Sequence, residues 1–256
     1  MSVWGKVLGA GAGFALGGPL GALVGAAAGH YIAKFRANAL SSEGSDNASF
    51  SGDNSQEARQ VVFATALVVL SAKLAKADGV VSREEIVRFK SIFNIPKSEI
   101  SSVGAIFDKA KETADGFEPY AEQVAQLFQS TPAVLENLVG ALFEIAKSDG
   151  WVHEAELRYL RNVSRIFGLD SGTFARISSQ YAPADGEPDP HSVLGVSSDT
   201  PDQQLKARYR ELVVQHHPDK LIANGMPPEF VQKANEKLAL INSSYDKICA
   251  QRNGTI

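Results

Sequence analysis

The stretch "DQQLKARYRELVVQHHPDK", residues 202 to 220, determines how the C-terminal part of the chain folds. Its apolar side chains recur three or four residues apart, at Leu205, Tyr209, Leu212 and Val213. That spacing places them on one face of an α-helix, with Lys206 and Arg210 one turn apart near the solvent side. Pro218 disfavours the helical conformation at His217. The sequence therefore predicts an amphipathic helix that ends in an exposed His-Pro-Asp turn.

A second helix is predicted after this turn. A polar loop leads to Pro227 and Pro228, and the helix then runs from about Glu229 to Cys249. The side chains expected on its buried face are Ala234, Leu238, Ile241 and Tyr245. Before the first helix, "DPHSVLGV" (189–196) predicts one short helical turn. We therefore expect two antiparallel helices with an exposed loop at their tip, preceded by a small helix.

Four separated segments agree in order and spacing with a known family: "DPHSVLGV", "P-D-x-x-L-K-x-x-Y-R-x-L", "HHPDK" and a helix with "I-N-x-x-Y". Together they resemble the J domain of DnaJ-type co-chaperones. The resemblance implies that His217, Pro218 and Asp219 form the loop that triggers ATP hydrolysis in an Hsp70 partner. The other residues that it implies for Hsp70 binding are Lys206, Tyr209, Arg210 and Lys220. Positive charge on this surface should speed docking to an acidic partner and make docking salt-sensitive.

This segment also departs from the family. Glu211 and Gln215 occupy positions that are often basic, so the positive strip is thinner. No Gly/Phe-rich linker follows, and Cys249 is the one cysteine, which excludes a Cys-x-x-Cys zinc region and an intramolecular disulfide. The J-like segment lies at the end of the chain. We therefore do not expect a general DnaJ-type chaperone with its own substrate-binding domains.

The middle of the chain contains an internal repeat. "AKADGVVSREEI" begins at Ala75 and "AKSDGWVHEAEL" begins at Ala146, and each copy lies between two apolar helical runs. Two helix–turn–helix units are expected, with further helices between them. The paired "A-K-x-D-G-x-V" turns in an all-helical region resemble the TerB family of tellurite-resistance operons. The resemblance implies a metal or partner site at the acidic turns, where Asp78 and Asp149 match.

Two explanations of the acidic repeat residues stay open. In the first, the glycines of both turns end one helix and the acidic residues begin the next, as Ser82 and Glu85 do in a capping box. His153 is a poorer cap in the second copy, but Glu156 keeps the acidic first turn. In the second, four carboxylates hold a divalent cation such as calcium, magnesium or manganese: Asp78, Asp149, Glu85 and Glu156. We expect no other cofactor.

The N-terminal segment has a glycine at every fourth position from Gly5 to Gly29, and no residue from Val7 to Gly29 is charged. These 23 uncharged residues would span roughly 35 Å as a helix, enough to cross a bilayer core. Glycines four residues apart let a partner helix approach closely in lipid. We expect a membrane-spanning helix, kinked at Pro19, that contacts lipid and forms a homodimer through its glycines: Gly9, Gly13, Gly17, Gly21 and Gly25.

Three other interpretations fit this segment: a cleaved signal peptide with its small-residue site at Ala26–Ala28, a disordered glycine-rich tail, and an interfacial helix. A signal peptide usually has a shorter apolar core and a more basic start, so a retained anchor is favoured. Polar, Gly/Ser-rich and Pro-rich breaks then divide an all-α chain. The predicted parts are an anchor at 1–36, a flexible linker at 37–56, a TerB-like helical bundle at 57–181, a linker at 182–188 and a J domain at 189–256.

The whole architecture resembles the membrane-anchored DnaJ-like proteins of the DjlA type in Gram-negative bacteria. It implies a co-chaperone that recruits a cytosolic Hsp70 of the DnaK type, with a single-pass anchor in the inner membrane and the J domain facing the cytoplasm. The alternative is a metal- or stress-sensing scaffold that acts through the TerB-like domain. A net charge of −4 argues against nucleic-acid binding. The chain shows no phosphate loop or nucleophile motif, so we do not expect an enzyme.

Overall fold

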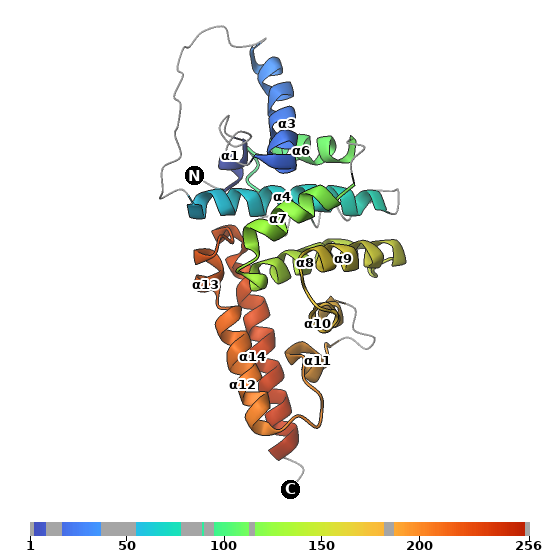
Figure 1. The fold of residues 1–256 in the computed structure, drawn as a ribbon, viewed down its shortest axis with the longest axis vertical. Coiled ribbons are helices and arrows are strands. Elements are labelled where there is room, and N and C mark those ends of the chain that lie inside the picture. The colour runs from blue at the N-terminus through green and yellow to red at the C-terminus, as the bar shows by residue number, and fades with distance from the viewer. Residues whose placement is uncertain are drawn as a thin grey trace.

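The computed structural model describes residues 3–8, 17–36, 55–77, 89, 95–112, 116–181 and 187–253. Within these ranges the regular secondary structure is helical and includes no strand, which confirms the predicted all-α class. Figure 1 shows a bundle of helices from which a long helical hairpin, α12 and α14, extends away toward the C-terminus.

The bundle is built around α4 (Ser55–Ala77). Six described helices pack directly against it: the N-terminal helices α1 (Val3–Leu8) and α3 (Gly18–Arg36), and α6 (Ile100–Glu112), α7 (Glu118–Phe128), α8 (Pro132–Ala146) and α9 (Glu154–Ile166). A further helix, α10 (Ser171–Tyr181), packs on α8. The two apolar runs expected before the repeat turns are thus α4 and α8, and the run expected after the second turn is α9. The run expected at 86–93 lies outside the described residues, except for Phe89.

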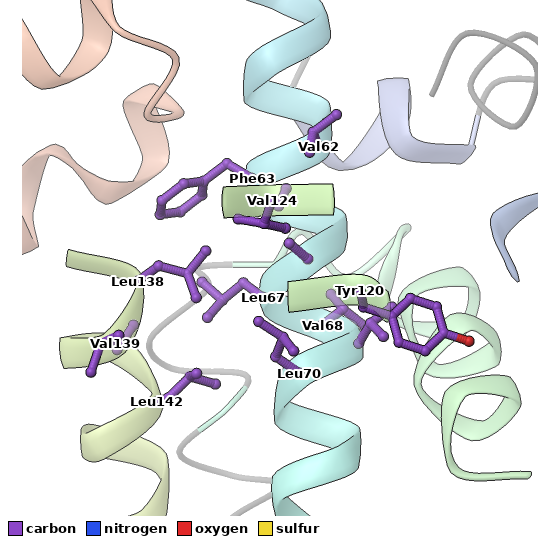
Figure 2. Packing of buried hydrophobic residues seen from close by; sticks show 14 of the residues in the cluster. Val62, Phe63, Leu67, Val68, Leu70, Tyr120, Val124, Leu138, Val139 and Leu142 are labelled. Atoms are coloured by element: carbon purple, nitrogen blue, oxygen red, sulfur yellow. The ribbon is translucent and has the colours of Figure 1, made fainter. Parts of the chain in front are cut away.

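Residues 61–75 of α4 are buried without interruption because neighbouring helices surround α4. In Figure 2, Phe63, Leu67 and Leu70 of α4 lie close to apolar side chains of α8. Full burial of such a side chain stabilises the fold by about 1.5–3 kcal/mol. Among the described helices, α4 is also the one long and apolar enough to cross a membrane. Since most of its apolar stretch is buried inside the fold, α4 fits a core helix.

The N-terminal segment forms two helices in the described residues, α1 (Val3–Leu8) and α3 (Gly18–Arg36). A single helix through Val7–Gly29 was predicted, and this continuity is wrong. Gly17 and Gly18 have φ angles of +54° and +57°, a left-handed conformation that glycine adopts readily, so the helix begins there. Pro19 lies in the first turn of α3, where a missing N–H costs little, and does not kink a helix interior. The apolar part of α3 is Gly18–Ala27.

The C-terminal part contains α11 (Pro190–Leu194), α12 (Asp202–Gln215), α13 (Pro218–Ala223), a 3₁₀ turn η3 (Pro228–Phe230) and α14 (Val231–Asn253). The predicted antiparallel hairpin is present. Its helices share a buried apolar cluster with α11, which comprises Leu194, Leu205, Leu212, Ile241 and Ile248. The sequence predicted a polar loop after the His-Pro-Asp turn, whereas the structure has a short helix there. Pro218 lies at the start of α13, where its fixed φ favours a helix start.

Candidate functional site

The His-Pro-Asp turn is a helix N-terminus at the tip of the hairpin. His217 is the N-cap of α13, with an extended backbone, and its Nδ1 atom accepts a hydrogen bond of 3.3 Å from the Asp219 backbone N–H. Pro218 is buried beneath the turn. The side chains of His217 and Asp219 are 50% and 90% exposed. The turn therefore has a defined backbone and presents one imidazole and one carboxylate to a partner.

The predicted basic residues lie on the exposed surface of the two helices that flank this turn. Lys206 and Arg210 are exposed one turn apart on α12, and Lys220 is exposed on α13. Glu211, the acidic residue that thins the positive strip, is paired with two neighbours on α12. Its carboxylate lies 2.7 Å from Arg208 Nη1 and accepts a hydrogen bond of 3.0 Å from Gln215. Because Arg208 is paired with Glu211, the exposed positive charge of α12 comes from Lys206 and Arg210.

Tyr209 was predicted to bind Hsp70, and the structure shows that it also has a structural role. Its ring stacks on Tyr245 of α14, with 4.1 Å between the ring centroids. Its hydroxyl donates a hydrogen bond of 3.1 Å to the Asn242 side chain, also on α14. Tyr209 therefore holds the two hairpin helices together, and only part of its surface is available to a partner.

The predicted cation ligands are described only in part. Asp78 and Glu85 lie outside the described residues, and Asp149 belongs to the 3₁₀ turn η2 (Lys147–Asp149). Glu156 is buried, and its Oε2 accepts a 2.8 Å hydrogen bond from the His153 backbone N–H, as the capping explanation predicts. In the part of the chain that the structure describes, no three His, Cys, Asp or Glu residues form a metal-binding group. The four-carboxylate site stays a prediction.

The predicted glycine contact is also described in part. Gly9 and Gly13 lie outside the described residues, and Gly17 precedes α3. Gly21 and Gly25 both belong to α3, where Gly21 is buried and Gly25 is exposed. A Cβ atom added at Gly25 would meet nothing within 4 Å. The surface of α3 therefore has open space beside Gly25, one of the predicted contact glycines.

A buried charge cluster lies between the bundle and the hairpin, and the sequence did not predict it. Glu136 of α8 is its one carboxylate and forms an ion pair with Arg176 of α10. From the hairpin, His216 Nε2 lies 3.3 Å and Lys237 Nζ 3.6 Å from Glu136 Oε2. Nothing local marks these residues, because Glu136 and His216 are 80 positions apart in the chain. His216 is fully buried directly before the His-Pro-Asp turn.

Burial and mutual interaction shift the pKa values in this cluster. Burial alone would raise the pKa of Glu136, but His216, Lys237 and Arg176 outweigh burial and hold it well below its usual range. Burial and then the Lys237 ammonium lower the pKa of His216 to about 4, so the imidazole is neutral at pH 7. Burial lowers the pKa of Lys237 to about 8, against the attraction of Glu136. At neutral pH the carboxylate thus faces two cations and a neutral imidazole.

Comparisons with known proteins agree with this arrangement. Three family models match the chain: the transmembrane domain of co-chaperone DjlA at residues 1–45, the tellurite resistance protein TerB at 64–179 and the DnaJ domain at 189–252. No solved structure is significantly similar. The transmembrane match, together with the apolar start of α3, supports a membrane anchor.

Curated relatives match over nearly the whole chain. The co-chaperone protein DjlA of Photobacterium profundum is 32% identical, with 96% of this chain and 98% of the relative covered. The protein of the same name from Coxiella burnetii is 29% identical, with coverages of 95% and 96%. That from Vibrio cholerae is 30% identical, with coverages of 97% and 98%. With its DjlA transmembrane, TerB and DnaJ domains in this order, the chain belongs to the DjlA family of J-domain co-chaperones.

Proposed function

We propose that this protein stimulates ATP hydrolysis by a cytosolic Hsp70 of the DnaK type and recruits that Hsp70 to the bacterial inner membrane. The observation that carries the proposal is the exposed His217–Asp219 pair at the tip of a hairpin whose helix α12 also carries exposed cations. The loop adds no nucleophile of its own, so the protein regulates its partner's hydrolysis and is not itself the enzyme. The positive charge of Lys206 and Arg210 would steer an acidic partner surface toward the loop.

The proposed topology follows from where the partner lies. Hsp70 and its ATP are cytosolic, so the J domain faces the cytoplasm and the N-terminus crosses the inner membrane once. We further propose that the anchor contacts lipid and dimerises through its glycines, which would bring two J domains together near the membrane surface. The TerB-like domain would select what the recruited Hsp70 acts on. Trp151, which is 68% exposed beside the second acidic turn, gives this domain an apolar contact point for a partner.

The test is single-turnover ATP hydrolysis by a DnaK-type Hsp70 in the presence of the full chain in detergent micelles. We expect the wild-type protein to accelerate hydrolysis and His217→Gln to abolish the acceleration, because glutamine cannot replace the imidazole presented at the tip. His153→Gln is the matched control, since His153 also occupies a helix N-cap position but lies in the bundle. This control should stimulate as well as the wild type.

Failure of folded wild-type protein to stimulate hydrolysis would contradict the proposal. The alternative, a metal- or stress-sensing scaffold, would then be favoured. That alternative predicts loss of function in Asp78→Ala and Asp149→Ala and an unchanged phenotype in His217→Gln.

A further inference from the structure

The His-Pro-Asp turn is held from both sides by the TerB-like domain. On one side, His216 is the C-cap of α12 and its backbone N–H donates to Leu212 O at 2.9 Å, while its imidazole is buried beside Glu136. The next residue caps α13, where the Leu221 N–H donates to His217 O at 3.0 Å. The backbone at position 216 therefore sets both the end of α12 and the start of α13.

On the other side, the end of α13 lies against α4. Gln56 Nε2 donates a hydrogen bond of 3.0 Å to Ile222 O. Gly225 has a φ of +104°, and a Cβ atom at this position would lie 2.5 Å from Arg59 Cβ and 3.1 Å from Phe128. Just beyond, Phe230 packs edge-to-face on Phe63, with 5.2 Å between centroids. The bundle thus fixes the segment after the turn and leaves the side chains of the turn itself exposed.

The surroundings of His216 select one tautomer. Asn137 Nδ2 donates to Ala133 O at 2.7 Å and lies 3.5 Å from His216 Nδ1. When Nδ1 accepts from Asn137, the imidazole proton is on Nε2, which faces the Glu136 carboxylate. Arg176 forms an ion pair with the same carboxylate oxygen, Glu136 Oε2. The imidazole thus lies between the Asn137 amide and the Glu136 carboxylate. Its Nε2 atom makes no hydrogen bond, but moving the ring would remove one polar neighbour from the buried carboxylate.

We propose that Glu136, in the TerB-like domain, is a positioning residue for the Hsp70-activating loop of the J domain and acts through His216. The inference rests on the proposed function for its activity readout. It makes the TerB-like domain part of the machinery that orients His217 and Asp219, so that a change in this domain alters how strongly the J domain activates its partner.

Three variants of the full chain test the proposal. Glu136→Gln keeps the shape of the side chain and removes its charge. His216→Phe keeps a ring at position 216 and removes both polar contacts without removing a charge, since His216 is neutral at pH 7. Glu144→Gln is the matched control: Glu144 also pairs across the same domain seam, 3.0 Å from Lys233 Nζ, but the structure gives it no contact with position 216.

The first measurement is a titration of Hsp70 ATP hydrolysis with each variant. A positioning role predicts that the maximal stimulation falls about tenfold in Glu136→Gln and His216→Phe, the effect of losing one buried polar contact. The concentration for half-maximal stimulation should change less, because Lys206 and Arg210 are intact. Glu144→Gln should keep the maximal stimulation. Equal loss in all three variants would mean that domain docking in general matters, and would overturn the specific role of Glu136.

The second measurement is backbone amide hydrogen exchange in α13 without Hsp70, and it separates this inference from the proposed function. Faster exchange at Leu221 and Asn224 in Glu136→Gln and His216→Phe, but not in Glu144→Gln, supports positioning even if the wild type stimulates no Hsp70. Unchanged exchange in folded variants overturns it. If Glu136→Gln fails to fold, His216→Phe decides, since it leaves the Glu136–Arg176 pair intact.

Discussion

Gly225 shows how tightly the segment after the His-Pro-Asp turn is packed. We expect Gly225→Ala to lower the free energy of unfolding by about 2–4 kcal/mol, because alanine pays for the positive φ and its Cβ would overlap Arg59. Urea unfolding of the purified chain measures the loss. The control is Gly168→Ala, where φ is +71° but nothing lies within 4 Å, so about 1 kcal/mol of backbone strain is expected alone. Equal losses of unfolding free energy in the two variants would show that Arg59 and its neighbours move aside at little cost.

Single residues differ in how far the sequence predicts them. His217, Pro218 and Asp219 were predicted because their order is local and three flanking segments support it, and the structure places them together at the tip. Glu156 was predicted as a helix-start residue from its spacing, and its carboxylate caps α9. Glu136, Arg176 and Lys237 were not predicted, because they lie on three helices that are distant in the sequence and meet only in the folded chain.

Helix α3 illustrates a different limit of sequence patterns. The four-residue glycine spacing predicted one long helix, but spacing alone does not show which glycines are helical. The pair Gly17–Gly18 before Pro19 breaks the pattern, since both adopt positive φ. Helices α4 and α8 were predicted well because long apolar runs are a strong signal. A long apolar run does not show whether a helix is buried in protein or in lipid. Helix α4 therefore has the length and hydropathy of a membrane span although it is a core helix.

The proposed dimer depends on Gly21 and Gly25, the two predicted contact glycines that belong to α3. We expect the double substitution Gly21→Leu and Gly25→Leu to weaken self-association of the anchor about tenfold, because bulky side chains would separate the two backbones. A membrane reporter of helix association checks this. Leu23→Ile, which changes shape but not volume at a position about 200° around the helix from Gly25, should leave association unchanged. Equal signals from the double variant and the wild type would remove the proposed dimer contact.

The docked arrangement of bundle and hairpin could not be predicted from the sequence, because both domains have apolar helix faces and nothing in the sequence shows which of these faces meet. The structure joins the two through Glu136, Lys233 and Lys237, and through Phe63 on Phe230. A chain whose domains dock through buried ionisable groups should have a stability that depends on pH. His216 dominates this dependence in mild acid. Its neighbours are Glu136 on α8, Arg176 on α10, Lys237 on α14 and the neutral amide of Asn137.

The sign of the pH dependence follows from the folded-state pKa of His216, which is about 4 against 6.5 in the open chain. The unfolded chain binds the proton more readily, so the stabilisation is present above pH 6.5 and is lost as the pH falls toward 4. Glu136, with its lowered pKa, adds a loss at still lower pH, and Lys237 stays charged throughout this window. From pH 7 to pH 5 we expect His216 to cost about 2 kcal/mol of unfolding free energy. Urea unfolding of the wild type and of His216→Phe at both pH values measures this contribution of His216. The variant has no imidazole at position 216, whereas all other groups titrate in both proteins. The same pH dependence in the two proteins would show that His216 is not neutral and buried at the domain seam.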